Sequence, residues 1–308
     1  MAIDRWTTAQ ILQFRYCEPM IGLILETLAK FPELAFMEAS PIPQTTYKIL
    51  VQTELPSVGF RLDNKGRKVQ RPKWEPRDVE CKFIDASWDV DNKVADEHPW
   101  GREIFLQHHA NSHFDAMFKK IAEQTWYGIV ADTTGFIGIQ SYLNNLTIPT
   151  VVNAKGTTAN SATSVYAVST GLQKAAYCWG QNGQIKDGPV HLAKTTDPDD
   201  PTSYFYAYSQ MINGHVGLQV GTPKCIGRIC NITEANPLND DLMSDLFNSF
   251  ETGFEPDAYF MTRKARAMLQ KSRKAYSPFG TPVTLPDEFW GKPIYVTDAL
   301  RNNEAIVA

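Results

Sequence analysis

The segment PWGREIFLQHHANSHFDAMFKKIAEQTWY, residues 99–127, is the longest part of this chain that a single helix can occupy. Its apolar residues recur three or four positions apart, the spacing that places side chains on one face of a helix. They are Leu106, Ala110, Phe114, Met117, Phe118 and Ile121. A helix of this length would extend for about 40 Å, well beyond the average globular helix. The segment predicts a strut rather than a catalytic element.

Composition bounds the class of protein. The chain has 308 residues, 43% of them hydrophobic and 21% charged, which is typical of a folded globular protein with one or two cores. No window approaches the roughly 20 apolar residues that a bilayer span requires, and the first residues do not resemble an export signal. A net charge of −4 argues against a broad phosphate-binding surface. Five scattered cysteines indicate reduced thiols, so we expect a cytoplasmic site of synthesis.

A basic arm is predicted before the long helix. Residues 46–54 alternate as a strand does, and a second extended run covers residues 79–88. The connection between them, residues 56–77, is longer than a compact domain normally needs. Its basic residues are Arg61, Lys65, Arg67, Lys68, Arg71, Lys73 and Arg77. We interpret it as an arm that contacts another copy of the chain, with Asp89 and Asp91 as its acidic counterparts.

The remaining elements are predicted from periodicity and turn signals. A helix is expected over residues 7–29 and a short buried strand over 34–37. Turn residues punctuate six short strands between residues 165 and 232, which indicates an antiparallel β subdomain. Helices at 240–250 and 263–271 and strands at 258–261 and 293–296 follow.

The motifs of common enzyme classes are missing: the chain has no phosphate-binding glycine loop, dinucleotide fingerprint, serine elbow or His-Glu-x-x-His. His109 and His113 are four apart on the long helix, with His98 nearby, and could present two imidazoles to zinc. The further ligand that a site needs is not evident, so we predict no metal and no cofactor. The alternatives left open are a zinc-dependent hydrolase and a nucleic-acid binder that uses the arm. The arm has only Phe60 and Trp74 for base stacking, which favours protein contact.

The order of these parts resembles a known family. Residues 55–61 (LPSVGFR) look like the outgoing strand of its extended loop, and residues 83–91 (FIDASWDVD) look like the return. The long helix is similar to its spine helix, followed by Trp126-Tyr127-Gly128 and the segment FIGIQ at 136–140. Residues 227–232 (GRICNI) and 291–298 (GKPIYVTD) resemble later strands. The chain thereby resembles the major capsid proteins of tailed double-stranded-DNA bacteriophages, in the subgroup with an inserted β domain.

This resemblance implies an α+β fold of the Hong Kong 97 type. Its parts would be an N-terminal arm (residues 1–45), an extended β-hairpin loop (46–86), a peripheral domain (87–152) with the spine helix at 99–127, an inserted antiparallel β subdomain (153–233), and an axial domain with closing peripheral strands (234–308).

The same resemblance implies a structural protein and not an enzyme. Copies would form the pentamers and hexamers of an icosahedral shell around phage DNA, assembled in the host cytoplasm and retained in the virion. Portal, scaffolding or decoration proteins are further expected partners, and no membrane is. An encapsulin-like shell that holds cargo protein is the alternative within the fold.

Overall fold

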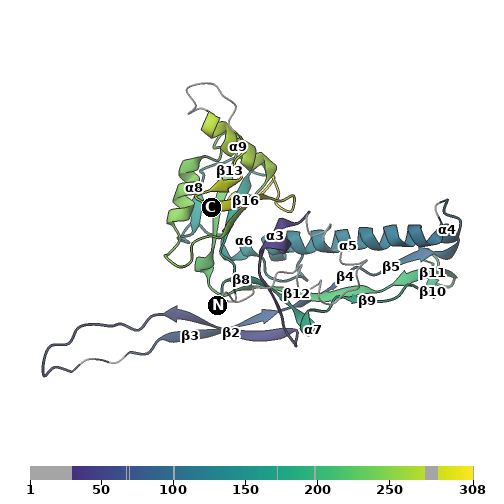
Figure 1. Cartoon of the computed structure of the whole chain (residues 1–308), viewed down its shortest axis with the longest axis horizontal. Helices are drawn as coiled ribbons and strands as arrows, with labels where there is room; N and C mark the ends of the chain where they lie inside the picture. Colours follow the sequence, from purple (N-terminus) through teal and green to yellow (C-terminus); the bar gives the residue numbers. More distant parts are fainter. Residues whose placement is uncertain are drawn as a thin grey trace.

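The computed structural model describes residues 30–307, except residues 67, 69, 100, 172, 198 and 275–283. The predicted helix over residues 7–29 and Arg67 lie outside this part. The molecule is elongated (Figure 1). A hairpin of β2 (Thr46–Glu54) and β3 (Lys73–Glu80) extends to one side, and the helix α5 (Arg102–Tyr127) extends to the other. A third part stands beside the junction of the two and contains α8 (Asp240–Asn248) and α9 (Arg263–Lys274).

Three sheets accompany the hairpin. The five-stranded sheet has the order β1-β8-β12-β4, with β9 also paired to β12; its strands are β1 (Ala39–Pro41), β4 (Lys82–Asp85), β8 (Ala175–Trp179), β9 (Lys186–Asp187) and β12 (Ile212–Val220). The three-stranded sheet has the order β10-β11-β5, with strands β5 (Trp88–Asp91), β10 (His191–Thr196) and β11 (Tyr204–Gln210). The six-stranded sheet has the order β15-β16-β14-β7-β13-β6, with strands β6 (Val151–Asn153), β7 (Thr163–Val168), β13 (Ile226–Ile232), β14 (Ala258–Met261), β15 (Glu288–Phe289) and β16 (Lys292–Val296).

Short helices join these elements. They are α3 (Pro32–Phe36), α4 (Asn92–Asp96), α6 (Ile139–Tyr142), the tight turn α7 (Gly180–Gly183) and the 3₁₀ turns η1 (Gly128–Val130) and η2 (Pro223–Cys225).

The long helix is present as predicted, although it begins at Arg102 rather than Pro99. Five of the six residues in its predicted apolar stripe are buried, and Ala110 is partly buried against the same core. That core also takes in β8 and β12 of the five-stranded sheet, so packing fixes α5 mainly over its C-terminal half, from Phe114 to Tyr127. The segment is therefore a strut, as its sequence indicates.

Two glycines allow the end of α5 to turn sharply. Gly128 has a φ of 56°, and a Cβ there would lie 2.1 Å from the backbone nitrogen of Gly138. A Cβ on Gly138 would in turn lie 2.4 Å from the nitrogen of Gly128. No side chain fits between these backbones. The two short motifs that resemble the capsid family, at 126–128 and 136–140, therefore meet in space through their glycines.

The strands between residues 163 and 232 do not form a sheet of their own. The predicted strands are present, but β7 and β13 pair with β14 and β6 in the six-stranded sheet, while β8 and β12 pair with β1 and β4. β11 pairs with β5. Periodicity locates strands but not their partners, which is why the sequence suggested a self-contained antiparallel unit.

The predicted strand over residues 34–37 is wrong, because Pro32–Phe36 forms the short helix α3. Pro32 occupies the first turn, where a missing N–H costs nothing, and apolar runs this short do not separate strand from helix. α3 buries Glu33 completely, and this carboxyl accepts a hydrogen bond from the hydroxyl of Thr297 at 3.1 Å. Burial, the main cause, raises the pKa of Glu33 to about 7.

No helix in the described ranges is both long enough and apolar enough to cross a membrane.

Candidate assembly surfaces

The arm is a two-stranded hairpin with a long connection at its tip. β2 is the strand predicted at 46–54. It pairs antiparallel with β3, so that Thr46 lies opposite Glu80 at the base of the arm and Glu54 lies opposite Lys73 toward its tip. The second run was predicted to start at Val79, but β3 already begins at Lys73, so the connection is residues 55–72 and not 56–77. Pro76 is tolerated because β3 is an edge strand. The arm is therefore stiffer at its base than the sequence suggested.

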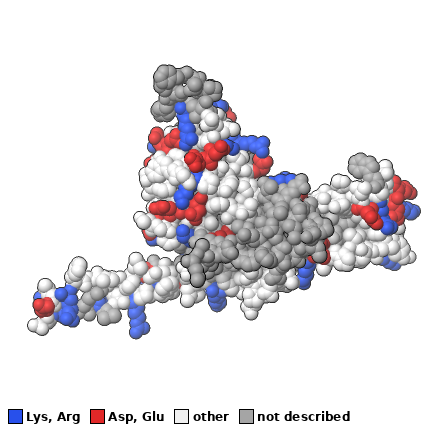
Figure 2. Space-filling view, in the orientation of Figure 1, with Lys and Arg blue, Asp and Glu red and all other residues white. Residues whose placement is uncertain are grey.

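The basic residues of the arm lie where they can reach a neighbour. Arg61, Lys65, Lys68 and Arg71 are exposed in the connection, and Figure 2 shows basic side chains gathered at the tip of the arm. Lys73 lies at the start of β3, and its ammonium group is 2.7 Å from the Glu54 carboxylate of the opposite strand. Arg77 lies farther down β3 and is half-buried. The connection thus carries the exposed positive charge.

The root of the arm is anchored in the five-stranded sheet. The hydroxyl of Tyr47 lies 3.0 Å from the Cys178 sulfur and also donates to the Gln219 side chain. The Cys81 thiol, directly after β3, donates to the backbone carbonyl of Cys178 in β8 at 3.4 Å. Burial raises the pKa of the Cys178 thiol to about 11, so it remains neutral. These contacts hold the direction of the arm relative to the rest of the subunit.

Gly217 sets how closely the arm root can approach. A Cβ at this position would lie 2.6 Å from the backbone oxygen of Glu80. We therefore expect Gly217→Ala to lower the free energy of unfolding by about 1 to 3 kcal/mol, because the backbone must shift to admit the methyl group. Thermal unfolding followed by circular dichroism measures this. Gly59→Ala is the control, since a Cβ there meets nothing within 4 Å; an equal effect of both substitutions would contradict the prediction.

The acidic counterparts lie at the opposite end of the molecule. Asp89 is an exposed residue of β5, and Asp91 caps α4 through a hydrogen bond from the N–H of Lys93 at 2.8 Å. Residues 85–98 carry five acidic and one basic residue, whereas the connection 55–72 carries five basic and one acidic. The strands of the hairpin and the helix α5 run in opposite directions and would together span about 70 Å. The arm of a subunit therefore cannot reach its own acidic end.

The histidines on α5 do not assemble into a metal site. His109 and His113 both lie beside the Trp88 ring, with centroid separations of 5.9 and 6.3 Å. Burial and the neighbouring His113 lower the pKa of His109. His98, His109 and His113 help to line an open groove of about 470 Å³, but in the described part of the chain no three His, Cys, Asp or Glu side chains are grouped to hold an ion. The geometry gives no support to the zinc-hydrolase alternative.

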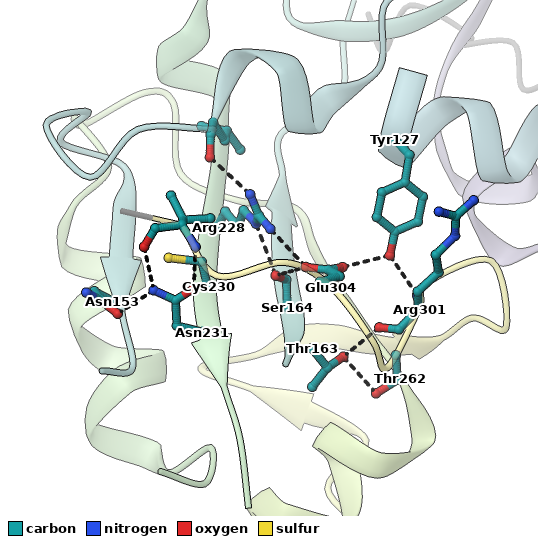
Figure 3. A network of polar contacts seen from close by, with 12 residues as sticks. Tyr127, Asn153, Thr163, Ser164, Arg228, Cys230, Asn231, Thr262, Arg301 and Glu304 are labelled. Atoms are coloured by element: carbon teal, nitrogen blue, oxygen red, sulfur yellow. Dashed lines mark hydrogen bonds and ion pairs between the residues drawn. The ribbon is translucent and has the colours of Figure 1, made fainter. Parts of the chain in front are cut away.

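A buried polar network joins the long helix to the six-stranded sheet (Figure 3). The Arg228 guanidinium lies 2.8 Å from the Glu304 carboxylate, and both side chains are buried. Arg228 also donates to Ser164 and to the carbonyl of Leu143, at 3.0 and 3.3 Å. The other carboxylate oxygen of Glu304 accepts from the Tyr127 hydroxyl at 2.7 Å. The network ties the end of α5, the sheet and the C-terminal segment together.

The sequence did not reveal this network, because its partners are far apart in the chain. The available signal was a single arginine inside the apolar strand Ile226–Ile232, since a buried arginine requires an anionic partner. Asn231 of the same strand adds two hydrogen bonds to the backbone of Val307, at 2.9 and 2.8 Å.

Comparison with known proteins agrees with this architecture. A chain of the bacteriophage Epsilon15 structure has 18% identity, a TM-score of 0.65 and coverage of 88% of each chain, which shows a shared fold. The bacteriophage JBD30 capsid has 10% identity and a TM-score of 0.47, over 85% of this chain and 88% of that chain. The SrpI encapsulin of Synechococcus elongatus has 9% identity and a TM-score of 0.45, over 65% and 86%. No curated protein sequence matches.

The family comparison covers nearly the whole chain. The model described as major capsid protein GP7 matches residues 21–308. Together with the Epsilon15 likeness, this match confirms the prediction of a phage capsid fold of the Hong Kong 97 type. The chain therefore belongs to the major capsid protein GP7 family and is a subunit of a capsid shell.

Proposed function

We propose that copies of this chain join head to tail into pentamers and hexamers, and that these close into an icosahedral shell around double-stranded DNA. The observation that carries the proposal is the placement of a basic arm and an acidic surface at opposite ends of one elongated subunit. Such a subunit offers two different surfaces to its neighbours, the arrangement that generates rings when the rotation closes.

The charges of these two surfaces favour a defined orientation. The exposed basic residues Arg61, Lys65, Lys68 and Arg71, with Arg67 and Lys73, are proposed to meet Asp89 and Asp91 of the next subunit. Complementary charges of this kind set register and speed of encounter more than final affinity. We propose that buried apolar area supplies most of the affinity between subunits, and that the charges set their relative orientation.

The other parts of the subunit follow from this arrangement. We place the six-stranded sheet, with α8 and α9, at the centre of each capsomer as the axial domain. We place the N-terminal segment at the rim of the capsomer. Assembly is proposed to take place in the host cytoplasm. Scaffolding, portal and decoration proteins are proposed partners of the finished shell.

A charge exchange tests the arm contact. Lys68→Glu combined with Arg71→Glu should raise the protein concentration needed for shell formation by about tenfold or more, because like charges then face each other. Adding Asp89→Lys should restore part of the yield. Negative-stain microscopy and sedimentation at a fixed ionic strength measure both results.

The matched control is Lys224→Glu with Glu251→Lys, an exchange within an exposed ion pair away from the arm. Because that pair lies inside one subunit, assembly should be unchanged. If arm reversal leaves shells intact, or if Asp89→Lys does not improve them, the proposed contact is wrong.

The contents of purified shells test the enclosed material. We expect double-stranded DNA inside particles from infected cells, measured by the ratio of absorbance at 260 and 280 nm and by nuclease protection. Particles that hold a folded cargo protein and no DNA would favour the encapsulin-like alternative.

A further inference from the structure

Besides the charged surfaces, the acidic end carries a partly exposed aromatic surface. Leu192, Tyr204 and Tyr206 are each more than half exposed. Their strands pair so that Leu192 faces Tyr208, Lys194 faces Tyr206 and Thr196 faces Tyr204. Residues directly opposite each other in a sheet share a face, as do alternate residues along a strand. Leu192, Tyr204 and Tyr206 thus share one face, here called the aromatic platform. Lys194 lies on the same face, and its ammonium group is 3.3 Å from the centre of the Tyr204 ring.

The helices cover only the inner end of this face. The Tyr208 hydroxyl donates to the Asp96 carboxylate at 3.3 Å, and the Arg102 guanidinium lies 5.5 Å from the centre of the Tyr208 ring. Tyr204 and Tyr206 are more than half exposed, so the helices leave much of their surface open, and β10 is the outer strand of the sheet. Exposed aromatic residues gathered in one patch are typical of protein interfaces, where tyrosine is enriched among the residues that matter most.

The tip of the arm carries the complementary apolar surface. Val58, Phe60 and Leu62 alternate with Gly59, Arg61 and Asp63, so an extended backbone places the three apolar side chains on one side. All three are strongly exposed, and Phe60 is fully exposed. We call them the apolar row. In the isolated subunit the apolar row stays in contact with solvent, because no described part of the chain covers it. It therefore adds no hydrophobic stabilisation until a partner buries it.

Charge favours the meeting of these two surfaces. Four exposed acidic residues border the platform: Asp199 and Asp200 in the loop between β10 and β11, Asp96 at the end of α4, and Glu97 after it. They outnumber Lys194, the basic residue on the platform. Arg61 lies between the apolar side chains of the row, and the connection carries an excess of positive charge. A second copy of the platform would bring like charges together, so the pattern selects the arm over self-pairing.

We infer that the aromatic platform of one subunit holds the apolar row of the arm of another copy. The inference rests on the proposed function and deepens it by naming the side chains that supply the apolar part of the contact. Asp89 pairs with Ser209 and therefore lies on the opposite face of the same sheet. The outgoing limb of the connection then contacts the platform through its apolar side. Arg61, on the other side of that limb, and Lys65, Lys68 and Arg71 of the returning limb remain for the Asp89 face. The open edge of β10 can also accept an extended segment.

Cysteine pairs test the contact in assembled particles. Shells of the double variant Phe60→Cys with Tyr206→Cys should give a ladder of covalent multimers after mild oxidation, seen on a non-reducing gel. Each single variant should stay near background. The matched control is Phe60→Cys with Trp290→Cys, which places the second thiol on an exposed aromatic position of the turn between β15 and β16.

The result separates the inference from the proposed function. Shells that form normally but link through position 290, or not at all, would overturn the platform while leaving assembly intact. Failure of the unaltered chain to form any shell would instead count against the proposed function.

A second measurement covers the case in which the cysteine variants do not assemble. Phe60→Ala and Tyr206→Ala should each raise the concentration needed for shells by about tenfold, since truncating a central aromatic side chain commonly has that effect. Leu50→Ala, which removes another exposed apolar side chain of the arm outside the row, should change it by less than about twofold. Equal effects from all three substitutions would overturn the inference.

Discussion

Replacing Glu304 with alanine should lower the free energy of unfolding of the subunit by about 3 to 5 kcal/mol, the largest effect we expect from one substitution. The change leaves the guanidinium of Arg228 buried without its anion, and it removes the acceptor of the Tyr127 hydroxyl. Arginine cannot escape this cost by losing its proton. Urea-induced unfolding of unassembled protein, followed by circular dichroism, measures the loss.

Two comparisons show whether the buried charge is the cause. Arg228→Met with Glu304→Leu removes both charges and should cost less than Glu304→Ala alone, because apolar replacements of a buried pair are often neutral. Glu251→Ala breaks the exposed pair with Lys224 and should cost no more than about 1 kcal/mol. A double variant as unstable as Glu304→Ala would show that packing, and not charge, dominates at this site.

The second large effect is a loss of stability as the pH rises, caused by Glu33. Burial raises the pKa of this carboxyl from 4.5 to about 7, so the folded protein binds its proton more tightly than the unfolded chain does. Between these two values the folded state holds the extra proton, and stability therefore falls with rising pH. The full contribution is present below about pH 4.5 and is lost above about pH 7. At 1.36 kcal/mol per pKa unit, the change is about 3 kcal/mol.

Glutamine at position 33 isolates this contribution, because it keeps the shape of the side chain and does not titrate. The difference in unfolding free energy between Glu33→Gln and the unaltered protein should grow in favour of Glu33→Gln from pH 5 to pH 8. Urea unfolding at several pH values provides the curve. A difference that is the same at every pH would mean that Glu33 keeps its ordinary pKa. Glu251→Gln controls for the loss of one exposed carboxyl.

Periodicity was sufficient wherever an element buries one regular face. The long helix and β2 fall where their apolar spacing places them. The strands β8 and β14, which are buried on both faces, fall where short apolar runs place them. It failed at residues 34–37, where an apolar run is too short to choose between strand and helix. It also failed at Lys73–Arg77, where charged residues and a proline suggested a loop. Each strand of a two-stranded hairpin is an edge strand, and an edge strand tolerates charged residues and proline.

The surfaces divide in a similar way. The basic connection and Asp89 were found from the sequence because charge is visible in composition, and their positions at opposite ends of the subunit needed the fold. The aromatic platform was not predicted, since Tyr204 and Tyr206 look like ordinary strand residues until the fold shows that both share the face of Tyr208 and are more than half exposed. The Arg228–Glu304 pair was hidden by a separation of 76 positions in the chain.

The way the arm is attached also determines how the subunit bears a mechanical load. β3 passes through Cys81 directly into β4, whose residues Lys82–Asp85 pair with Val216–Asn213 of β12. A pull along the arm therefore acts parallel to these strands and strains their hydrogen bonds together, in shear, instead of peeling them apart one at a time. Under tension between neighbouring subunits, we expect the contacts of the arm tip with the next subunit to break before the β4–β12 hydrogen bonds at its root do.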